Sequence, residues 1–215
     1  MSKLEDLHRI RQEYGTLELL EADLPENPIS QFEDWFAQHL LIEKETPNSM
    51  VISTSDSNGY PDSRVVLLKE LDKGAFVFYT NKYSAKGLQL ANNPHVALNF
   101  YWPKLMRQVR VRGVAHQVGK QQADDYFHSR PTASQLSAIA SPQSVEINSR
   151  DELDEAFTLT TAEYANKKII CPDSWAGYAV VPNEIEFWQG RDSRLHDRIQ
   201  YYRNKDTWCH RRLAP

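Results

Sequence analysis

A short stretch, residues 185–198, combines aromatic, cationic and imidazole side chains. Within it Arg194, His196 and Arg198 follow one another at intervals of two residues. On a strand this spacing points all three side chains to one face. Groups that are or can be cationic repel one another unless a negative group or water separates them. The spacing therefore favours an anionic ligand, although an exposed polar hairpin face would give the same pattern.

Polar residues also surround a predicted helix start at residue 84. Tyr79 and Thr80 come just before it, and Ser84 and Lys86 stand in its first turn. A helix N-terminus attracts anions because its N–H groups lack partners and its dipole is positive there. This group is suited to a phosphate, and simple capping by Ser84 is the alternative explanation.

A third group comprises Tyr126, Arg130 and Ser134 around a predicted helix end at Pro131. Arginine offers a planar fork to a phosphate, and tyrosine and serine add hydroxyl groups. An ordinary helix exit would explain the same residues. Two separate anion-binding clusters indicate either two phosphorylated ligands or one long one.

Arg64 and Lys69 bracket the apolar run 65–68 in a predicted strand. Such a strand can present its backbone to a flat ligand, with a positive charge at each end. A barrel strand with charged ends is the alternative.

The elements that must position these groups are mostly strands. Apolar and alternating runs predict strands at 50–55, 63–69, 74–80, 95–102, 107–115, 175–181 and 185–188, followed by a second hairpin strand from Arg194. Helical spacing predicts helices at about 30–44, with Ser30 and Glu33 as a capping box, and at 84–92, 119–129, 132–140 and 150–166. Prolines 25 and 28 separate an N-terminal arm, 1–28, from a single domain, 29–215. The pattern predicts an antiparallel barrel or sandwich with peripheral helices.

Composition excludes several classes of protein. Hydrophobic residues make up 40% and charged residues 25%, which is ordinary globular usage. The net charge of −4 excludes little, but Lys and Arg number 25 against 29 acidic residues, a balance that does not favour nucleic-acid binding. Cys171 and Cys209 form no CxxC pair, and the histidines lack HExxH spacing, so no metal site is expected. The absence of a leader pattern and of about 18 consecutive apolar residues predicts a cytoplasmic protein without a membrane span.

No GxGxxG, Walker or GxSxG motif occurs in the chain. Several segments instead resemble, in order, the pyridoxine (pyridoxamine) 5′-phosphate oxidases, and they cover nearly the whole chain. They are the 64–69 strand, 78–81, 107–109, 126–131, 143–144, the 185–198 stretch and the terminal Arg212-Leu213-Ala214-Pro215.

The resemblance implies an FMN-binding split β-barrel, mainly β and antiparallel with Greek-key connections and peripheral helices. It implies oxidation of pyridoxamine 5′-phosphate or pyridoxine 5′-phosphate to pyridoxal 5′-phosphate in vitamin B6 biosynthesis and salvage, with O₂ reduced to H₂O₂. It also implies a homodimer with FMN at the interface.

By position, the resemblance implies flavin contacts at Arg64, Val65, Val66, Leu67, Leu68, Lys69, Tyr79, Thr80, Lys86, Gln108, Gln143, Ser144, Trp188 and Arg198. It implies substrate contacts at Lys69, Tyr126, Arg130, Ser134, Arg194, Leu195 and His196, with Arg11 and Tyr14 on the arm as a lid. Arg194 and His196 are the implied catalytic pair. His196 titrates near neutrality and is the candidate proton acceptor. Some relatives carry an arginine where this chain has Ala85.

Two other functions stay open at this point. One is a split-barrel flavin oxidoreductase that acts on a different substrate. The other is a non-catalytic carrier of pyridoxal 5′-phosphate, which would bind no flavin.

Overall fold

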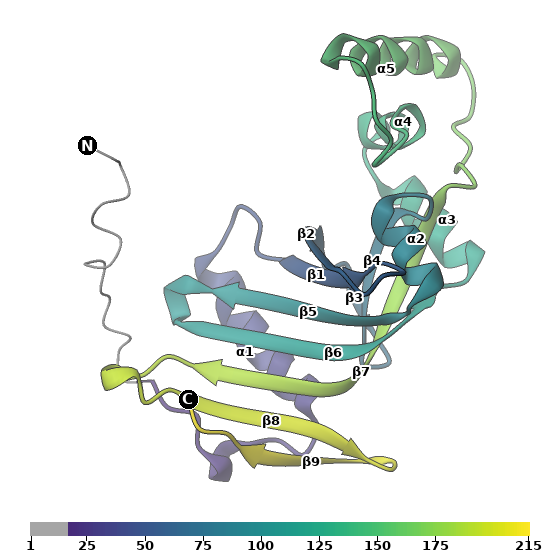
Figure 1. The fold of residues 1–215 in the computed structure, drawn as a ribbon. Coiled ribbons are helices and arrows are strands. Elements are labelled where there is room, and N and C mark those ends of the chain that lie inside the picture. The colour runs from purple at the N-terminus through teal and green to yellow at the C-terminus, as the bar shows by residue number, and fades with distance from the viewer. Residues whose placement is uncertain (1–16) are drawn as a thin grey trace, which may run out of the picture. The chain divides into compact units, whose positions relative to one another are not determined.

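The computed structural model describes residues 17–215 (Figure 1). The predicted lid residues Arg11 and Tyr14 lie outside the described residues. Within the described part, one sheet has the strand order β2-β1-β5-β6-β7-β4-β3, and β8 pairs with both β7 and β9. The strands are β1 (Ser49–Ser55), β2 (Pro61–Leu67), β3 (Glu70–Asp72), β4 (Ala75–Asn81), β5 (His95–Trp102), β6 (Arg107–Gln117), β7 (Trp175–Gln189), β8 (Asp197–Asn204) and β9 (Thr207–Arg212).

Helices account for most of the remaining structure. They are α1 (Pro28–Ile42), α2 (Ala85–Asn92), α3 (Lys120–Ser129), α4 (Thr132–Ala140) and α5 (Arg150–Tyr164), with 3-10 turns η2 (Glu21–Asp23), η3 (Pro103–Leu105) and η4 (Asp192–Arg194). Among the described residues, no helix has the length and apolar character needed to cross a bilayer. The pairs β1–β2, β3–β4, β4–β7, β7–β8 and β8–β9 are antiparallel, as the alternating patterns predicted.

Contacts divide the chain into two compact units. The described part of unit 1 comprises residues 17–47, 98–112 and 183–215, and unit 2 comprises 48–97 and 113–182. Strands β5, β6 and β7 each contribute residues to both units. The single-domain boundary at residue 29 stays a prediction.

Unit 1 buries the apolar stripe of α1. Phe32 has no exposed surface and meets Phe100 edge-on at a centroid distance of 5.0 Å, and Trp35 meets Phe187 in the same way at 5.3 Å. Arg107 stacks on Trp35 at 4.3 Å from its ring centroid. These aromatic contacts fix α1 against the strands of the same unit.

Unit 2 has its core on β4, where Phe76, Val77 and Phe78 are fully buried. β4 pairs with the first half of β7, so that Phe78 lies opposite Tyr178. α4 and α5 lie next to each other in this unit (Figure 1). The unit therefore carries a strand layer and a group of helices whose loops hold polar residues.

Three local predictions were wrong. α1 begins two residues early, because Asn27 caps it by accepting from the Ile29 N–H and Pro28 occupies the first turn, so Ser30 is not the cap. β7 is one strand of 15 residues and is not divided between 181 and 185. The hairpin strand begins at Asp197 and not at Arg194, because η4 occupies Asp192–Arg194.

Candidate functional site

A cavity of about 410 Å³ in unit 2 collects most of the residues predicted there. Its volume lies within the range of small-molecule sites. Strands β2, β4 and β7 and helices α2, α3 and α4 contribute residues to its wall. The lining residues are Val65, Val66, Leu67, Lys69, Tyr79, Thr80, Lys86, Tyr126, Arg130, Pro131, Ser134, Gln143 and Trp175.

Three residues predicted to contact flavin in this unit do not line the cavity. Arg64 forms an ion pair with Asp62. Leu68 is buried, and its backbone N–H and C=O both bond to Asn48. Ser144 has a left-handed backbone with φ 71° in an exposed turn. Flavin contacts at these three residues therefore stay predictions.

Lys86 lies in the first turn of α2 and is 8% exposed. Its ammonium group donates to Gln143 Oε1 at 3.0 Å and to Thr80 Oγ1 at 3.3 Å. No carboxylate lies within ion-pair distance of it in the described part of the chain. Burial, followed by the nearby positive charge of Arg64, lowers the pKa of Lys86. A phosphate bound here would supply the missing negative charge.

Arg130 caps the C-terminal end of α3 and is only partly exposed. Its guanidinium group stacks on the Trp175 indole at 4.3 Å from the ring centroid. Arg130 Nη1 and Trp175 Nε1 are both buried and have no hydrogen-bond partner among the described residues. Burial lowers the pKa of Arg130. Unpartnered donors of this kind are costly unless a ligand satisfies them.

Parallel aromatic rings line the same cavity. Tyr79 and Tyr126 stack with a centroid distance of 3.9 Å and an interplanar angle of 12°. Trp175 lies nearly parallel to both rings. The Tyr79 hydroxyl donates to Glu70 at 2.8 Å, and burial together with this carboxylate raises the pKa of Tyr79. Lys69 lies over the Tyr126 ring at 5.8 Å, so one rigid aromatic stack lies beside two cations, Lys69 and Arg130.

Unit 1 brings together a second set of predicted residues. Trp188 on β7 lies directly opposite Arg198 on β8. Glu186, two residues before Trp188, bonds to Arg198 and to Arg110 of β6. Gln108 lies two residues before Arg110 on β6, so its side chain projects to the same face as that of Arg110. Gln108, Trp188 and Arg198 therefore share one sheet face.

Arg194 and His196 lie before β8, which begins at Asp197, so the strand period used in the spacing argument does not apply to them. Arg194 has φ 60° at the end of η4, and Leu195 is 70% exposed. The His196 ring lies 4.7 Å from the Trp188 ring, and its Nδ1 accepts a hydrogen bond from the Arg191 N–H at 3.0 Å. Burial and then the positive charge of Arg194 lower the pKa of His196. Its neutral form therefore carries the proton on Nε2.

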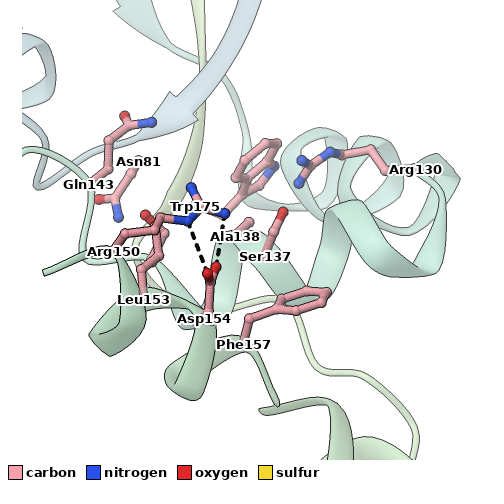
Figure 2. Close-up of a pocket in the computed structure, with 12 residues that line it drawn as sticks. Asn81, Arg130, Ser137, Ala138, Gln143, Arg150, Leu153, Asp154, Phe157 and Trp175 are labelled. Carbon is pink, nitrogen blue, oxygen red and sulfur yellow. Dashed lines mark hydrogen bonds and ion pairs between the residues drawn. The ribbon is translucent and has the colours of Figure 1, made fainter. Parts of the chain in front are cut away.

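A larger cavity of about 510 Å³ adjoins the same residues in unit 2. It shares Arg130, Gln143 and Trp175 with the smaller cavity and is otherwise walled mainly by α4 and α5. Figure 2 shows Arg130 pointing toward Trp175, and the ion pair between Arg150 and Asp154 on α5. The smaller cavity is the better candidate for the site, because it contains both Lys86 and Arg130, whereas the larger cavity contains only Arg130 of these two cations.

Sequence reasoning missed Trp175 and Glu186. Trp175 stands in the predicted strand 175–181 and Glu186 in the predicted strand 185–188, and neither was assigned a ligand contact. The partners that define their roles lie on other elements of the fold.

Two family models match the chain. The model for pyridoxamine 5′-phosphate oxidase matches residues 37–166, and the model for the pyridoxine 5′-phosphate oxidase C-terminal dimerisation region matches residues 175–215. A pyridoxine/pyridoxamine 5′-phosphate oxidase of Legionella pneumophila is 56% identical over 215 residues, which is 100% of both chains. The chain belongs to the pyridoxamine 5′-phosphate oxidase family. A second member, from Haemophilus influenzae, is 46% identical over 98% of this chain and 100% of its own length.

Solved structures confirm the fold class expected for a pyridoxamine 5′-phosphate oxidase. PhzG from Burkholderia lata, in complex with tetrahydrophenazine-1-carboxylic acid, is 26% identical and covers 94% of this chain and 100% of its own, with a TM-score of 0.87. A pyridoxamine 5′-phosphate oxidase-related, FMN-binding protein from Nostoc punctiforme, 16% identical, covers 88% of this chain and 98% of its own with a TM-score of 0.72. The antiparallel FMN-binding split barrel predicted from the sequence is therefore correct.

Proposed function

We propose that this protein is an FMN-dependent oxidase that produces pyridoxal 5′-phosphate for vitamin B6 biosynthesis and salvage. The amine reaction converts pyridoxamine 5′-phosphate, O₂ and H₂O to pyridoxal 5′-phosphate, NH₃ and H₂O₂. The alcohol reaction converts pyridoxine 5′-phosphate and O₂ to pyridoxal 5′-phosphate and H₂O₂. One observation carries the proposal: Lys86 and Arg130, two cations without carboxylate partners in the described chain, line a single cavity in a member of this family.

The residues around Lys86 fit the phosphate of FMN. Lys86, Thr80 and Gln143 already converge through hydrogen bonds, and the N-terminus of α2 adds the positive end of the helix dipole. Ala85 is exposed at the start of α2, so the relatives' arginine has no counterpart in the cavity wall. Other proposed flavin contacts that line the cavity are the residues of β2, Lys69 and Tyr79. Gln108, Trp188 and Arg198 of unit 1 are also proposed flavin contacts. The proposal further includes Arg64, Leu68 and Ser144, which do not line the cavity.

The residues around Arg130 fit the phosphate of the substrate. Arg130 Nη1 is an unused buried donor, and Lys69, Tyr126 and Ser134 line the same cavity. Trp175 holds the guanidinium plane, so the fork is oriented before a ligand arrives. Arg11 and Tyr14 remain part of the proposal as lid residues, and Leu195 as a substrate contact.

Arg194 and His196, the proposed catalytic pair, orient the substrate. When bound, FMN supplies the two-electron acceptor and passes the electrons to O₂. Arg194 acts through charge and position. Because His196 Nδ1 already accepts from Arg191, the ring offers Nε2–H as a donor to the C4′ substituent. The hydrogen bond favours this donor role over proton acceptance.

The proposal includes a homodimer and a cytoplasmic location. The match of residues 175–215 to a dimerisation region supports self-association. FMN at the interface and the cytoplasmic location are the expectations stated from the sequence.

One rival function has a specific observation in its favour. The fold is also that of PhzG, whose structure holds tetrahydrophenazine-1-carboxylic acid. Relatives named pyridoxine/pyridoxamine 5′-phosphate oxidase reach 56% identity over the full length, whereas PhzG reaches 26%. The unpaired donors at Arg130 also fit a phosphate better than a carboxylic acid alone, because a phosphate offers more acceptor oxygens.

The test is an absorbance spectrum of the FMN-reconstituted protein before and after anaerobic addition of pyridoxamine 5′-phosphate. Bleaching of the flavin band near ~450 nm, with recovery in air, is the expected result. If the bound flavin stays oxidised, the protein is a flavin oxidoreductase that acts on another substrate. Failure to bind flavin would favour the carrier.

A further inference from the structure

Glu186 is a buried carboxylate on β7 that bonds directly to a proposed flavin contact. It is 7% exposed. Its two oxygens accept from Arg198 Nε at 3.0 Å and Nη2 at 3.2 Å, and Arg110 Nη1 approaches Oε2 at 3.3 Å. This two-point contact fixes the plane of the Arg198 guanidinium group, which a single contact would leave free to rotate.

The rest of the guanidinium group is arranged to leave donors available. Arg198 Nη1 donates to the Ala214 carbonyl at 2.9 Å. Of the five N–H groups of an arginine, three are therefore occupied, and the other two have no acceptor among residues 17–215. Arg198 keeps 26% of its side chain exposed and lies opposite Trp188, so these two donors can reach a ligand on that face.

Burial of the Glu186 carboxylate costs desolvation free energy. A buried ion pair contributes little net stability, because desolvation offsets most of the attraction. Glu184, two residues earlier on the same strand face, makes the same kind of contact with Arg112 but is far more exposed, at 30% against 9% for the Glu186 side chain. Of these two glutamates, Glu186 is therefore the one whose carboxylate is buried while it forms an ion pair with an arginine.

We propose that Glu186 is a positioning residue for FMN binding, acting through Arg198. It holds the guanidinium group so that its two unoccupied N–H groups face the flavin. This inference rests on the proposed function, because Arg198 is a flavin contact only there. A cluster of Arg110, Arg198 and Glu186 without a ligand would be an ordinary ion-pair group.

The test measures the dissociation constant of FMN from the full-length apoprotein by flavin fluorescence quenching. Glu186→Gln and Glu186→Asp should each raise this constant by about tenfold or more, since each breaks the two-point contact. Glu184→Gln is the matched control and should change it by less than about threefold. The melting temperature of each apoprotein is measured in parallel. If Glu186→Gln does not fold, Glu186→Asp, which retains the negative charge, provides the test.

A double-mutant cycle tests whether the effect passes through Arg198. In an Arg198→Ala background, Glu186→Gln should weaken FMN binding by less than about twofold further. An undiminished effect in that background would overturn the inference, as would tighter FMN binding by Glu186→Gln. Lower apoprotein melting with unchanged FMN affinity would assign Glu186 a purely structural role and leave the oxidase proposal standing. Absence of FMN binding by the unmodified protein would overturn both.

Discussion

Arg130 is a residue of the described chain whose surroundings lack a hydrogen-bond acceptor. Its guanidinium group is stacked on Trp175, and Nη1 is buried without an acceptor in the described part of the chain. Burial lowers its pKa because no carboxylate compensates for the lost hydration. A bound phosphate would supply both the acceptor and the charge.

Replacing Arg130 should therefore affect the substrate more than the cofactor. Arg130→Ala is expected to lower kcat/KM for pyridoxamine 5′-phosphate by roughly 100-fold, about 2.7 kcal/mol, the size of one charge-assisted contact. Steady-state kinetics give kcat/KM, and an FMN titration gives the dissociation constant of the cofactor. Arg203→Ala is the control, since Arg203 also stacks on an indole, Trp208, at 4.1 Å, but not in the cavity. An equal loss of FMN affinity would place Arg130 at the flavin.

His196 should act as a hydrogen-bond donor across the neutral pH range. Its pKa is lowered by burial and by Arg194, so the ring is neutral at pH 7 and becomes charged only as the pH falls below its ordinary 6.5. His196→Gln preserves a terminal N–H and should keep kcat within about tenfold, whereas His196→Ala should lose more. The measurement is kcat against pH for all three proteins. A wild-type loss of kcat with falling pH through a neutral-range pKa, absent in His196→Gln, would restore a proton-accepting role.

At the scale of elements, an ion-pair network ties residues 17–23 to the hairpin of β8 and β9. Asp197, at the start of β8, accepts from the Leu19 N–H at 3.1 Å and from Arg212 Nη1 at 2.6 Å. Arg212 also bonds to both oxygens of Glu21. The described end of the predicted arm is therefore anchored beside the segment that carries Arg198.

This anchor makes a pH-dependent contribution to stability. The hydrogen bond from Arg212 lowers the pKa of Glu21 from 4.5 to about 2. Because the folded-state value lies below the unfolded one, the contribution is complete above pH 4.5 and is lost as pH falls toward about 2. Glu21→Gln should flatten this part of the curve of unfolding free energy against pH, measured in urea. The control is Glu26→Gln, at an exposed position, and equal slopes in both variants would refute the assignment.

Helix α2 depends on a glycine for its approach to the preceding loop. A Cβ on Gly87 would lie 2.2 Å from the backbone oxygen of Lys82, closer than atoms can approach. Gly87→Ala should therefore destabilise the protein by roughly 1–3 kcal/mol and displace Lys86, which weakens FMN binding. Gly119→Ala, where a Cβ meets nothing within 4 Å, should cost less than about 1 kcal/mol. Urea unfolding and FMN titration provide the comparison, and similar behaviour of the two variants would show that the loop yields easily.

At the scale of the whole molecule, the prediction concerns association. The matched dimerisation region, residues 175–215, includes β7, β8 and β9. We expect light scattering after size exclusion to give about twice the chain mass of 24.9 kDa at micromolar concentration, with one FMN per chain. A mass of one chain in the FMN-bound protein would contradict the dimer.

The sequence by itself determined the family and most strands of the sheet, but not β3 or the continuity of β7, and it predicted two anion-binding clusters. These depend on local rules: alternation places side chains on one face, and helix starts present N–H groups. The same rules failed at residues 192–196, because the left-handed backbone of Ser193 and Arg194 breaks the strand period there.

Only the tertiary structure decided which residues meet. Lys86 reaches Gln143 across 57 residues, and Trp175 supports Arg130 from a different element. Glu186 gains its partners Arg110 and Arg198 from neighbouring strands. Such contacts follow from strand pairing and core packing, in which apolar burial over many residues selects one arrangement, and no spacing along the chain encodes them.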